Sequence, residues 1–87
     1  MKKLLKIIKN NWGVTYNTLD METPLITLSE QIAMVSENST LEEVYKMYVG
    51  NPSIHLPGLI AFYIIDELGI DAEKVNVNMK LSHIISL

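Results

Sequence analysis

The residues that could support catalysis or bind a metal are few in this sequence. His55 and His83 are its two histidines, and Asp66 and Glu67 are adjacent carboxylates. A histidine beside a carboxylate can act as a general base, and two histidines three or four residues apart on a helix can bind zinc. Neither histidine has such a neighbour, and in a helix over 57–69 His55 and Asp66 would lie about 15 Å apart along the axis. We therefore expect His55 to lie in a loop or at the core edge, and the carboxylates to keep a helix end in water.

The sequence also lacks the motifs of common enzyme classes. It contains no P-loop, no GxSxG nucleophile elbow, no HExxH zinc motif and no GxGxxG dinucleotide-binding loop. The absence of cysteine excludes disulfides, thiolate metal sites and cysteine nucleophiles. No arginine is present, although arginine is the side chain best suited to bidentate contacts with phosphate or guanine. We expect no enzymatic activity and no cofactor, and nucleic-acid binding is disfavoured.

Length and composition predict one small globular domain, residues 1–87. The chain has 87 residues, of which 48% are hydrophobic and 20% charged, a balance typical of folded rather than disordered chains. A chain this short can bury only a modest core, so its many Ile, Leu, Val and Met side chains are difficult to cover in one protomer. We therefore expect a homo-oligomer or an obligate protein partner.

No segment of the sequence is long and apolar enough to cross a membrane. The longest uncharged apolar run is residues 58–65, far below the roughly 20 residues needed for a transmembrane helix. The first nine residues begin like a secretion signal, but Lys6 and Lys9 interrupt the apolar stretch that such a signal requires. We expect a cytoplasmic protein without a transmembrane segment.

Charge is distributed unevenly, with four of the lysines in the first nine residues and an acidic chain after them. Residues 2–12 predict an amphipathic helix with these apolar positions on one face: Leu4, Leu5, Ile8 and Trp12. The opposite face carries Lys2, Lys6 and Lys9. This lysine face could bind an anionic membrane surface or an acidic partner; alternatively it is solvated, while the apolar side packs on the core.

Three further helices are expected, at about 28–37, 40–49 and 57–69. Capping boxes predict where the first two begin: Thr27 with Glu30 for the first, and Ser39 with Glu42 or Thr40 with Glu43 for the second. Leu41, Val44, Tyr45 and Tyr48 then follow helical spacing, and Pro52 ends the pattern. For 57–69, Pro57 suits a first turn and Gly69 suits a C-terminal cap, which favours a central buried helix over a buried strand.

The C-terminal residues show a different period. Val75, Val77, Met79 and Leu81 alternate with polar residues, which predicts an extended or short β segment at 74–82 with one buried face. The whole chain is therefore expected to form a mainly α, small four-helix domain with this C-terminal addition.

Residues 12–28 and 68–84 are similar at an offset of 56 residues. Trp12-Gly13-Val14 aligns with Leu68-Gly69-Ile70, and the later apolar positions align as well: Leu19, Leu25 and Leu28 with Val75, Leu81 and Ile84. Such spacing also arises by chance. A true repeat would predict two similar arms around the central helices.

Three local resemblances to known families point in different directions. Residues 32–50 and the later Pro52-Ser53 and Leu68-Gly69 resemble the helix-turn-helix of repressor-type DNA-binding proteins, which implies a groove-facing helix over 39–48. In that interpretation Glu42 and Glu43 lie near the start of the recognition helix, where phosphate binding requires positive charge.

Two other segments resemble families that bind small groups. Residues 35–57 resemble the first strand, helix and second strand of a cystathionine-beta-synthase-type module, which implies nucleotide sensing. Residues 66–75 are similar to the first helix and loop of acyl carrier proteins, which implies a carrier-like helical module. The Asp-Ser-Leu attachment motif of that family is not found in this sequence.

Taken together, the residues favour a small cytoplasmic protein–protein interaction or regulatory module without catalysis, oligomeric or part of a complex. The alternatives are a helix-turn-helix regulator using residues 32–50 and an acyl-carrier-like module. Aromatic side chains at helical spacing can form either a binding patch or core. The candidate interaction residues are Lys2, Lys6, Lys9, Trp12, Tyr45, Tyr48, Phe62 and Tyr63.

Overall fold

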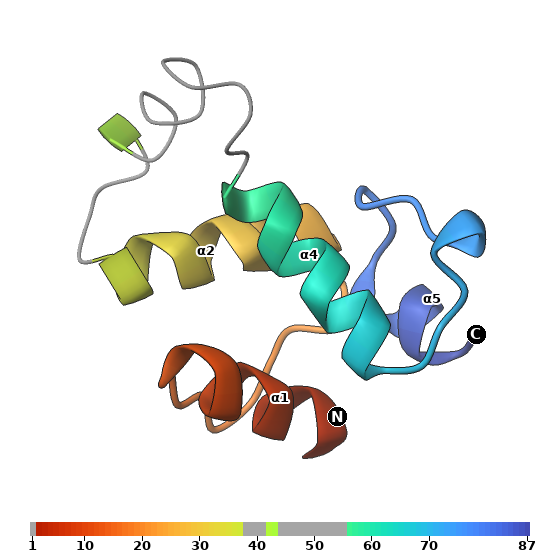
Figure 1. The fold of residues 1–87 in the computed structure, drawn as a ribbon. Coiled ribbons are helices and arrows are strands. Elements are labelled where there is room, and N and C mark those ends of the chain that lie inside the picture. The colour runs from red at the N-terminus through yellow and green to blue at the C-terminus, as the bar shows by residue number, and fades with distance from the viewer. Residues whose placement is uncertain (1, 38–41, 44–55) are drawn as a thin grey trace.

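A computed structural model describes residues 2–37, 42–43 and 56–87 of the chain. These residues form the following helices: α1 (Lys2–Trp12), α2 (Leu25–Glu37), α4 (Leu56–Glu67), the short 3-10 helix η1 (Ala72–Lys74) and α5 (Leu81–Ile85). Helix α4 packs mainly on α2 and also contacts α1 and η1. Figure 1 shows α4 crossing in front of α2, with α1 below it and the C-terminal segment beside its end. The prediction of a small, mainly α domain is confirmed for the described residues.

The core gathers apolar side chains from helices α1, α2, α4 and α5. The largest fully buried ones are Leu4, Ile8, Leu25, Leu28, Ile32, Ile60, Ile64, Ile65, Leu81 and Ile84. Of these, Ile60, Ile64 and Ile65 belong to α4, which packs on both α2 and α1. The strand alternative for residues 57–69 is therefore wrong, and the predicted helix extends from Leu56 to Glu67.

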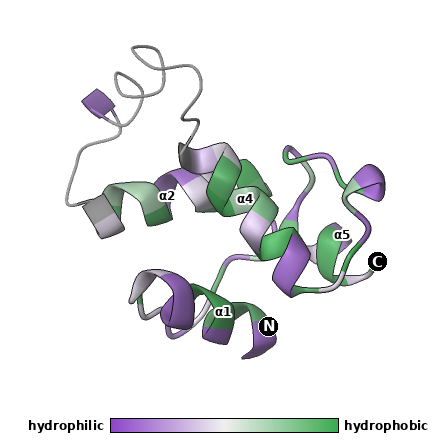
Figure 2. Cartoon of the chain, in the orientation of Figure 1, coloured by the Kyte–Doolittle hydropathy of each residue, from purple (hydrophilic) through white to green (hydrophobic). Residues whose placement is uncertain are grey.

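Helix α1 has the predicted bounds and the predicted two faces. Leu4 and Ile8 are buried as predicted, Ile7 is buried beside them, and the lysines lie on the opposite, exposed face. The predicted Leu5 and Trp12 are only partly buried. Figure 2 shows this division along α1, whereas α4 is apolar over most of its length. A helix of this length is marginally stable in isolation. Packing of its apolar face on the core provides the additional stability, while the lysine face stays in water.

The two similar segments adopt the same conformation at two points that the sequence alignment joins. Gly13 ends α1 with φ of 69°, and Gly69 follows α4 with φ of 73°. Both values lie in the left-handed region that favours glycine, so both residues act as helix C-terminal caps. In each loop that follows, an Asx turn forms at aligned positions: the side-chain oxygens of Asp20 and Asn76 accept from the N–H groups of Glu22 and Asn78.

The two loops also bind each other through a local two-fold arrangement. Pro24 and Lys80, which are aligned residues, form an antiparallel β-bridge. Four backbone hydrogen bonds flank this bridge, with these donor-to-acceptor distances: Leu25 to Met79 3.0 Å, Leu81 to Thr23 3.0 Å, Ile26 to Val77 2.8 Å and Ser82 to Met21 3.0 Å. These bonds form two symmetric pairs. If the donor number is raised by 56 and the acceptor number is lowered by 56, the bond from Leu25 to Met79 becomes the bond from Leu81 to Thr23, and the bond from Ile26 to Val77 becomes the bond from Ser82 to Met21. Residues 12–28 and 68–84 thus share their glycine caps, their Asx turns and this pairing, whereas α2 is longer than α5 and η1 has no counterpart at 16–18. We call residues 2–37 the N-terminal unit and residues 56–87 the C-terminal unit.

This pairing corrects the predicted start of α2. The Thr27–Glu30 capping box predicted a helix from about residue 28, but α2 begins at Leu25. The N–H groups of Leu25 and Ile26 are satisfied by carbonyls of the C-terminal unit, so the first turn needs no side-chain cap. Carbonyl groups about 50 residues away along the chain thus accept the hydrogen bonds that a local capping side chain was expected to accept.

The same pairing corrects the prediction for residues 74–82. The expected alternation of burial is present, since Val75, Val77 and Met79 are partly buried and Leu81 is buried. The backbone is nevertheless not a strand: η1 ends at Lys74, a turn follows at 77–78, Lys80 makes a single bridge, and α5 begins at Leu81. An Asx turn at Asn76 bends the chain, and the bridge at Pro24 cannot extend into a ladder because α2 begins at the next residue.

The helix predicted at 40–49 lies largely outside the described residues, as do Ser39, Tyr45, Tyr48 and His55. Within that range the structure describes Glu42 and Glu43, which are helical and exposed. The predictions that depend on the remaining residues, including the helix-turn-helix interpretation of 32–50, stay predictions.

Candidate functional site

The most distinctive surface of the described structure is one face of α4. Leu59, Phe62 and Tyr63 are 48%, 57% and 57% exposed. Together with Asp66 they line a shallow hollow of about 330 Å³. The four residues are spaced i, i+3, i+4 and i+7, so a helix places them on a single face. We call this set, Leu59, Phe62, Tyr63 and Asp66, the α4 patch.

The α4 patch continues onto the end of α1 through an aromatic contact. The rings of Trp12 and Tyr63 meet edge to face, with centroids 6.5 Å apart and planes at 87°, a favoured geometry for aromatic pairs. A second hollow of about 270 Å³ lies between these two rings and Asn11. Of the predicted interaction residues, the structure thus brings Trp12, Phe62 and Tyr63 into one surface.

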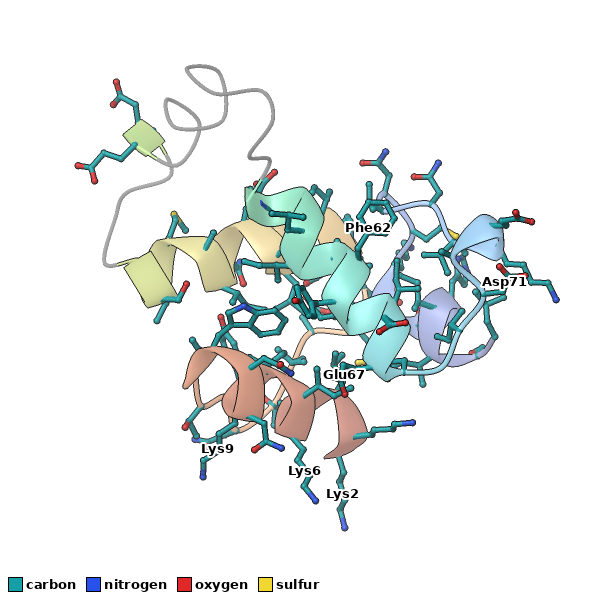
Figure 3. The ribbon with its side chains drawn as sticks, in the orientation of Figure 1. Lys2, Lys6, Lys9, Phe62, Glu67 and Asp71 are labelled. Atoms are coloured by element: carbon teal, nitrogen blue, oxygen red, sulfur yellow. The ribbon has the colours of Figure 1, made fainter. Side chains whose placement is uncertain are left out.

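The predicted lysine face is a separate surface. Lys2, Lys6 and Lys9 are exposed, and in Figure 3 their side chains project from α1 away from α4. A hollow of about 440 Å³ includes Lys6 and Glu67 in its lining, so only the end of α4 approaches this face. The two predicted groups of interaction residues therefore do not form one site.

The repeat makes these two surfaces directly comparable. At the 56-residue offset, Leu59 of α4 aligns with Lys3 of α1, and Phe62 aligns with Lys6. Asp66 aligns with Asn10. All of these positions are exposed in both helices. At these three positions α1 carries lysine and amide where α4 carries apolar and acidic side chains. The fourth position differs, because Tyr63 is exposed whereas its aligned residue Ile7 is buried.

The ends of α4 are electrostatically uneven. No acidic residue lies in its first turn and no basic residue in its last turn, whereas Asp66 and Glu67 are exposed at its C-terminal end. A helix carries partial positive charge at its N-terminus and partial negative charge at its C-terminus. The two carboxylates therefore add to the negative end instead of compensating it.

The remaining cavities and titratable groups show no catalytic arrangement in the residues described. A hollow of about 490 Å³ is lined mainly by apolar residues, together with Lys3, Asp71 and Lys74. Asp71 caps η1 by accepting a hydrogen bond from the N–H of Glu73. Within ranges 2–37, 42–43 and 56–87, no group of three or more His, Cys, Asp or Glu side chains could hold a metal ion.

Two pKa shifts occur outside the α4 patch. Partial burial raises the pKa of Tyr16 above its ordinary value. A hydrogen bond from Lys80 Nζ to Glu22 Oε2, 2.6 Å long, and the charge of that carboxylate raise the pKa of Lys80. This ion pair joins the N-terminal and C-terminal units at the surface next to the β-bridge. Neither group contributes to a site with a nucleophile or a general base.

The sequence interpretation missed Leu59 and Asp66 as members of the surface. Their spacing with Phe62 and Tyr63 was visible, but the whole segment was apolar, so its exposed face could not be separated from its buried faces. The alignment of 68–84 with 12–28, extended backwards into the preceding helices, is the signal that would have found them, because it sets Leu59 against Lys3.

Comparisons with known proteins assign this chain to no group. No family model, curated protein sequence or solved structure matches it. Among the helices of the described part, none has the length and apolar character to cross a membrane. The fold is that of a small, mainly helical domain with exposed apolar residues on α4.

Proposed function

We propose that this protein is a small interaction module that docks a protein partner through the α4 patch, without catalysis. The observation that carries the proposal is the contrast between aligned exposed positions. Folding of the N-terminal unit accepts lysine at residues 3 and 6, so folding of the C-terminal unit does not require Leu59 and Phe62 at the same places. Apolar side chains grouped on a surface without a folding role are typical of protein contact sites.

The chemistry of the patch agrees with this role. Aromatic residues such as Phe62 and Tyr63 are enriched at protein interfaces, where they bury large areas while losing little side-chain entropy. Tyr63 is held by Trp12, so part of the surface is ordered before a partner arrives. Asp66 adds a carboxylate at the rim, where charge contributes mainly to orientation of the partner.

Photo-crosslinking from the centre of the patch tests the proposal. A benzophenone amino acid replaces Phe62 in the full chain, produced in cells of its natural source. Irradiation is expected to join it to one protein species, identified by mass spectrometry together with the crosslinked residue. Leu59→Lys in the same chain is expected to reduce that adduct about tenfold, because it removes an adjacent apolar contact.

The matched control places the benzophenone at Val35, an apolar residue of α2 that is 58% exposed. A photoprobe there is expected to give no adduct that depends on Leu59. Equal adducts from positions 35 and 62, or an adduct from 62 that Leu59→Lys leaves unchanged, would contradict docking through the α4 patch. The proposal keeps the expectation of a cytoplasmic location, which cell fractionation tests.

A further inference from the structure

We infer that the occupant of the α4 patch is the α4 patch of a second copy of this chain, in an antiparallel two-fold pair. This inference rests on the proposed function and specifies its partner. It follows from three features of α4: the position of its apolar residues, the charges at its two ends, and the contrast with α1.

The positions of the apolar residues suit a self-complementary contact. Leu59, Phe62 and Tyr63 lie near the middle of α4, which extends from Leu56 to Glu67. In an antiparallel pair with its axis between residues 60 and 61, Leu59 of each copy packs against Phe62 and Tyr63 of the other. A two-fold contact uses the same surface twice and closes without leaving a free patch, which is why such dimers are the commonest oligomers.

This register also pairs the helix ends by charge. At about 1.5 Å per residue, Asp66 lies about 8 Å from the axis, one residue's rise beyond Leu56, the first residue of α4 in the other copy. That start carries the positive end of the helix dipole and has no acidic residue of its own. Each copy thus supplies the carboxylates that the N-terminus of the other lacks. A parallel pair would instead place the four carboxylates of the two chains side by side.

The lysine face of α1 on a second copy is the competing occupant, and it fits less well. It would meet Asp66 and Glu67 with opposite charge, but Lys3 and Lys6 offer the apolar residues Leu59 and Phe62 no apolar partner. Such a head-to-tail contact would also leave one patch and one lysine face free at the ends of every assembly. The two-fold pair buries the apolar side chains of both copies.

The size of the surface predicts how strong the dimer is. Three half-exposed side chains per copy form a contact smaller than the roughly 800 Å² per partner of standard stable interfaces. The dimer is therefore weak and dissociates on dilution, with exchange between monomer and dimer over accessible concentrations.

Sedimentation velocity over about 10 µM to 1 mM tests the pair. The wild-type chain is expected to shift from monomer to dimer across this range. Leu59→Lys with Phe62→Lys gives α4 the residues of α1 and is expected to raise the dissociation constant at least about tenfold. Val35→Lys, the matched exposed apolar control, and Lys6→Glu, which alters only the α1 face, are expected to leave the dissociation constant unchanged.

Disulfide trapping distinguishes the orientation of the two helices, since the natural chain has no cysteine. Phe62→Cys places two thiols near the axis, about 3–5 Å apart along it, and is expected to form a covalent dimer on oxidation. Asp66→Cys places them about 16 Å apart along the axis, beyond disulfide reach, and is expected to stay monomeric. Faster oxidation of Asp66→Cys than of Phe62→Cys would establish a parallel pair and overturn the antiparallel one.

Each remaining outcome is decisive as well. A monomer at 1 mM overturns self-pairing; if the Phe62 photoprobe then joins a different protein, the interaction function stands with another partner. Loss of the dimer in Lys6→Glu overturns the two-fold pair in favour of head-to-tail contact. A Leu59→Lys, Phe62→Lys chain that unfolds under native conditions shows that the patch belongs to the folding core, which overturns both proposals.

Discussion

Helices α1 and α4 align at the 56-residue offset and end in the same kind of glycine cap, yet their exposed faces differ in chemistry. Each ends at a glycine in the left-handed region, and each is followed by a loop that pairs with the other across the Pro24–Lys80 bridge. On the exposed side, α1 carries lysines where α4 carries Leu59 and Phe62. The caps and the paired loops position the two helices, so their exposed residues can differ without changing this part of the fold. These exposed residues then decide what each helix can contact.

The buried sides of the same helices differ for a reason visible in the packing. Leu4 and Ile8 of α1 align with Ile60 and Ile64 of α4, and all four are buried. Ile65 is also buried, but its aligned residue Lys9 is exposed. Helix α2 is the main packing partner of α4, which also contacts α1. The opposite difference occurs at Ile7, which is buried although its aligned residue Tyr63 is exposed.

Removing an equivalent core side chain from each helix should have the largest effect on this comparison. Ile8→Ala and Ile64→Ala each leave a cavity at a position with 0% exposure, and each is expected to lower the free energy of unfolding by about 2–5 kcal/mol. The loss should be greater for Ile64, because α4 is packed on two sides and its surroundings relax less. Urea denaturation followed by circular dichroism measures both, with Ile8→Val and Ile64→Val as milder versions if the alanine variants do not fold. A smaller loss at Ile64 would contradict the central position of α4.

The sequence predicted an element correctly where the groups that stabilise it lie within that element, and it failed where those groups lie far away along the chain. The bounds of α1 follow from residues within it, and sequence spacing predicted them. The start of α2 depends on carbonyls of Met79 and Val77, which no local pattern can indicate. The alternation of Val75, Val77 and Met79 predicted the correct buried side chains, but the wrong backbone, because two asparagine-containing turns also satisfy that alternation.

The candidate site was predicted in part. Phe62, Tyr63 and Trp12 were named because of their type, and the structure places them on one surface. The lysine face was correctly expected to be exposed and lies apart from them. What the sequence could not provide was the exposed side of an all-apolar helix, because exposure of Leu59 depends on where α1 and α2 pack around α4.

The two glycine caps offer a smaller and more symmetrical test. Gly13→Ala and Gly69→Ala place a Cβ in the left-handed region, at positions where no other atom lies within 4 Å. The cost is therefore backbone strain alone, about 1–2 kcal/mol at each site. Similar losses in thermal or urea unfolding are expected if the two units end their helices in the same way. D-alanine introduced by chemical synthesis is the control, since it accepts this conformation and should stabilise both. A large difference between the two sites would show that one cap is not equivalent to the other.

Transfer of the α4 surface onto α1 tests whether the surface alone determines association. Lys3→Leu with Lys6→Phe gives α1 the apolar residues of the α4 patch, at positions that are exposed in both helices. The free energy of unfolding is expected to change by less than about 0.5 kcal/mol. Sedimentation should show larger assemblies, because each copy now carries two exposed apolar faces that can associate. Lys3→Gln with Lys6→Gln controls for loss of charge and should add no association. If the grafted chain associates no more than wild type, the context of α4, including Trp12 against Tyr63, is part of the site.

The smallest expected effect concerns a contact that the repeat does not duplicate. Glu22 and Lys80 form an ion pair between the two units, but their aligned residues are Asn78 and Pro24. Glu22→Gln removes the carboxylate that raises the pKa of Lys80, so the Lys80 pKa should fall toward the ordinary lysine value, as measured by NMR titration of its side chain. Because the folded-state pKa is the raised one, the stabilisation is complete below the unfolded-state pKa and is lost as pH rises through the folded-state pKa. The unfolding curves of wild type and Glu22→Gln should therefore differ by a constant small amount at neutral pH and converge only in alkaline solution. Both side chains are largely exposed, so added salt should also reduce the difference in unfolding free energy. A difference that grows with pH would show that Glu22 stabilises the fold through a group other than Lys80. The Pro24–Lys80 β-bridge, and not this ion pair, would then hold the two units together.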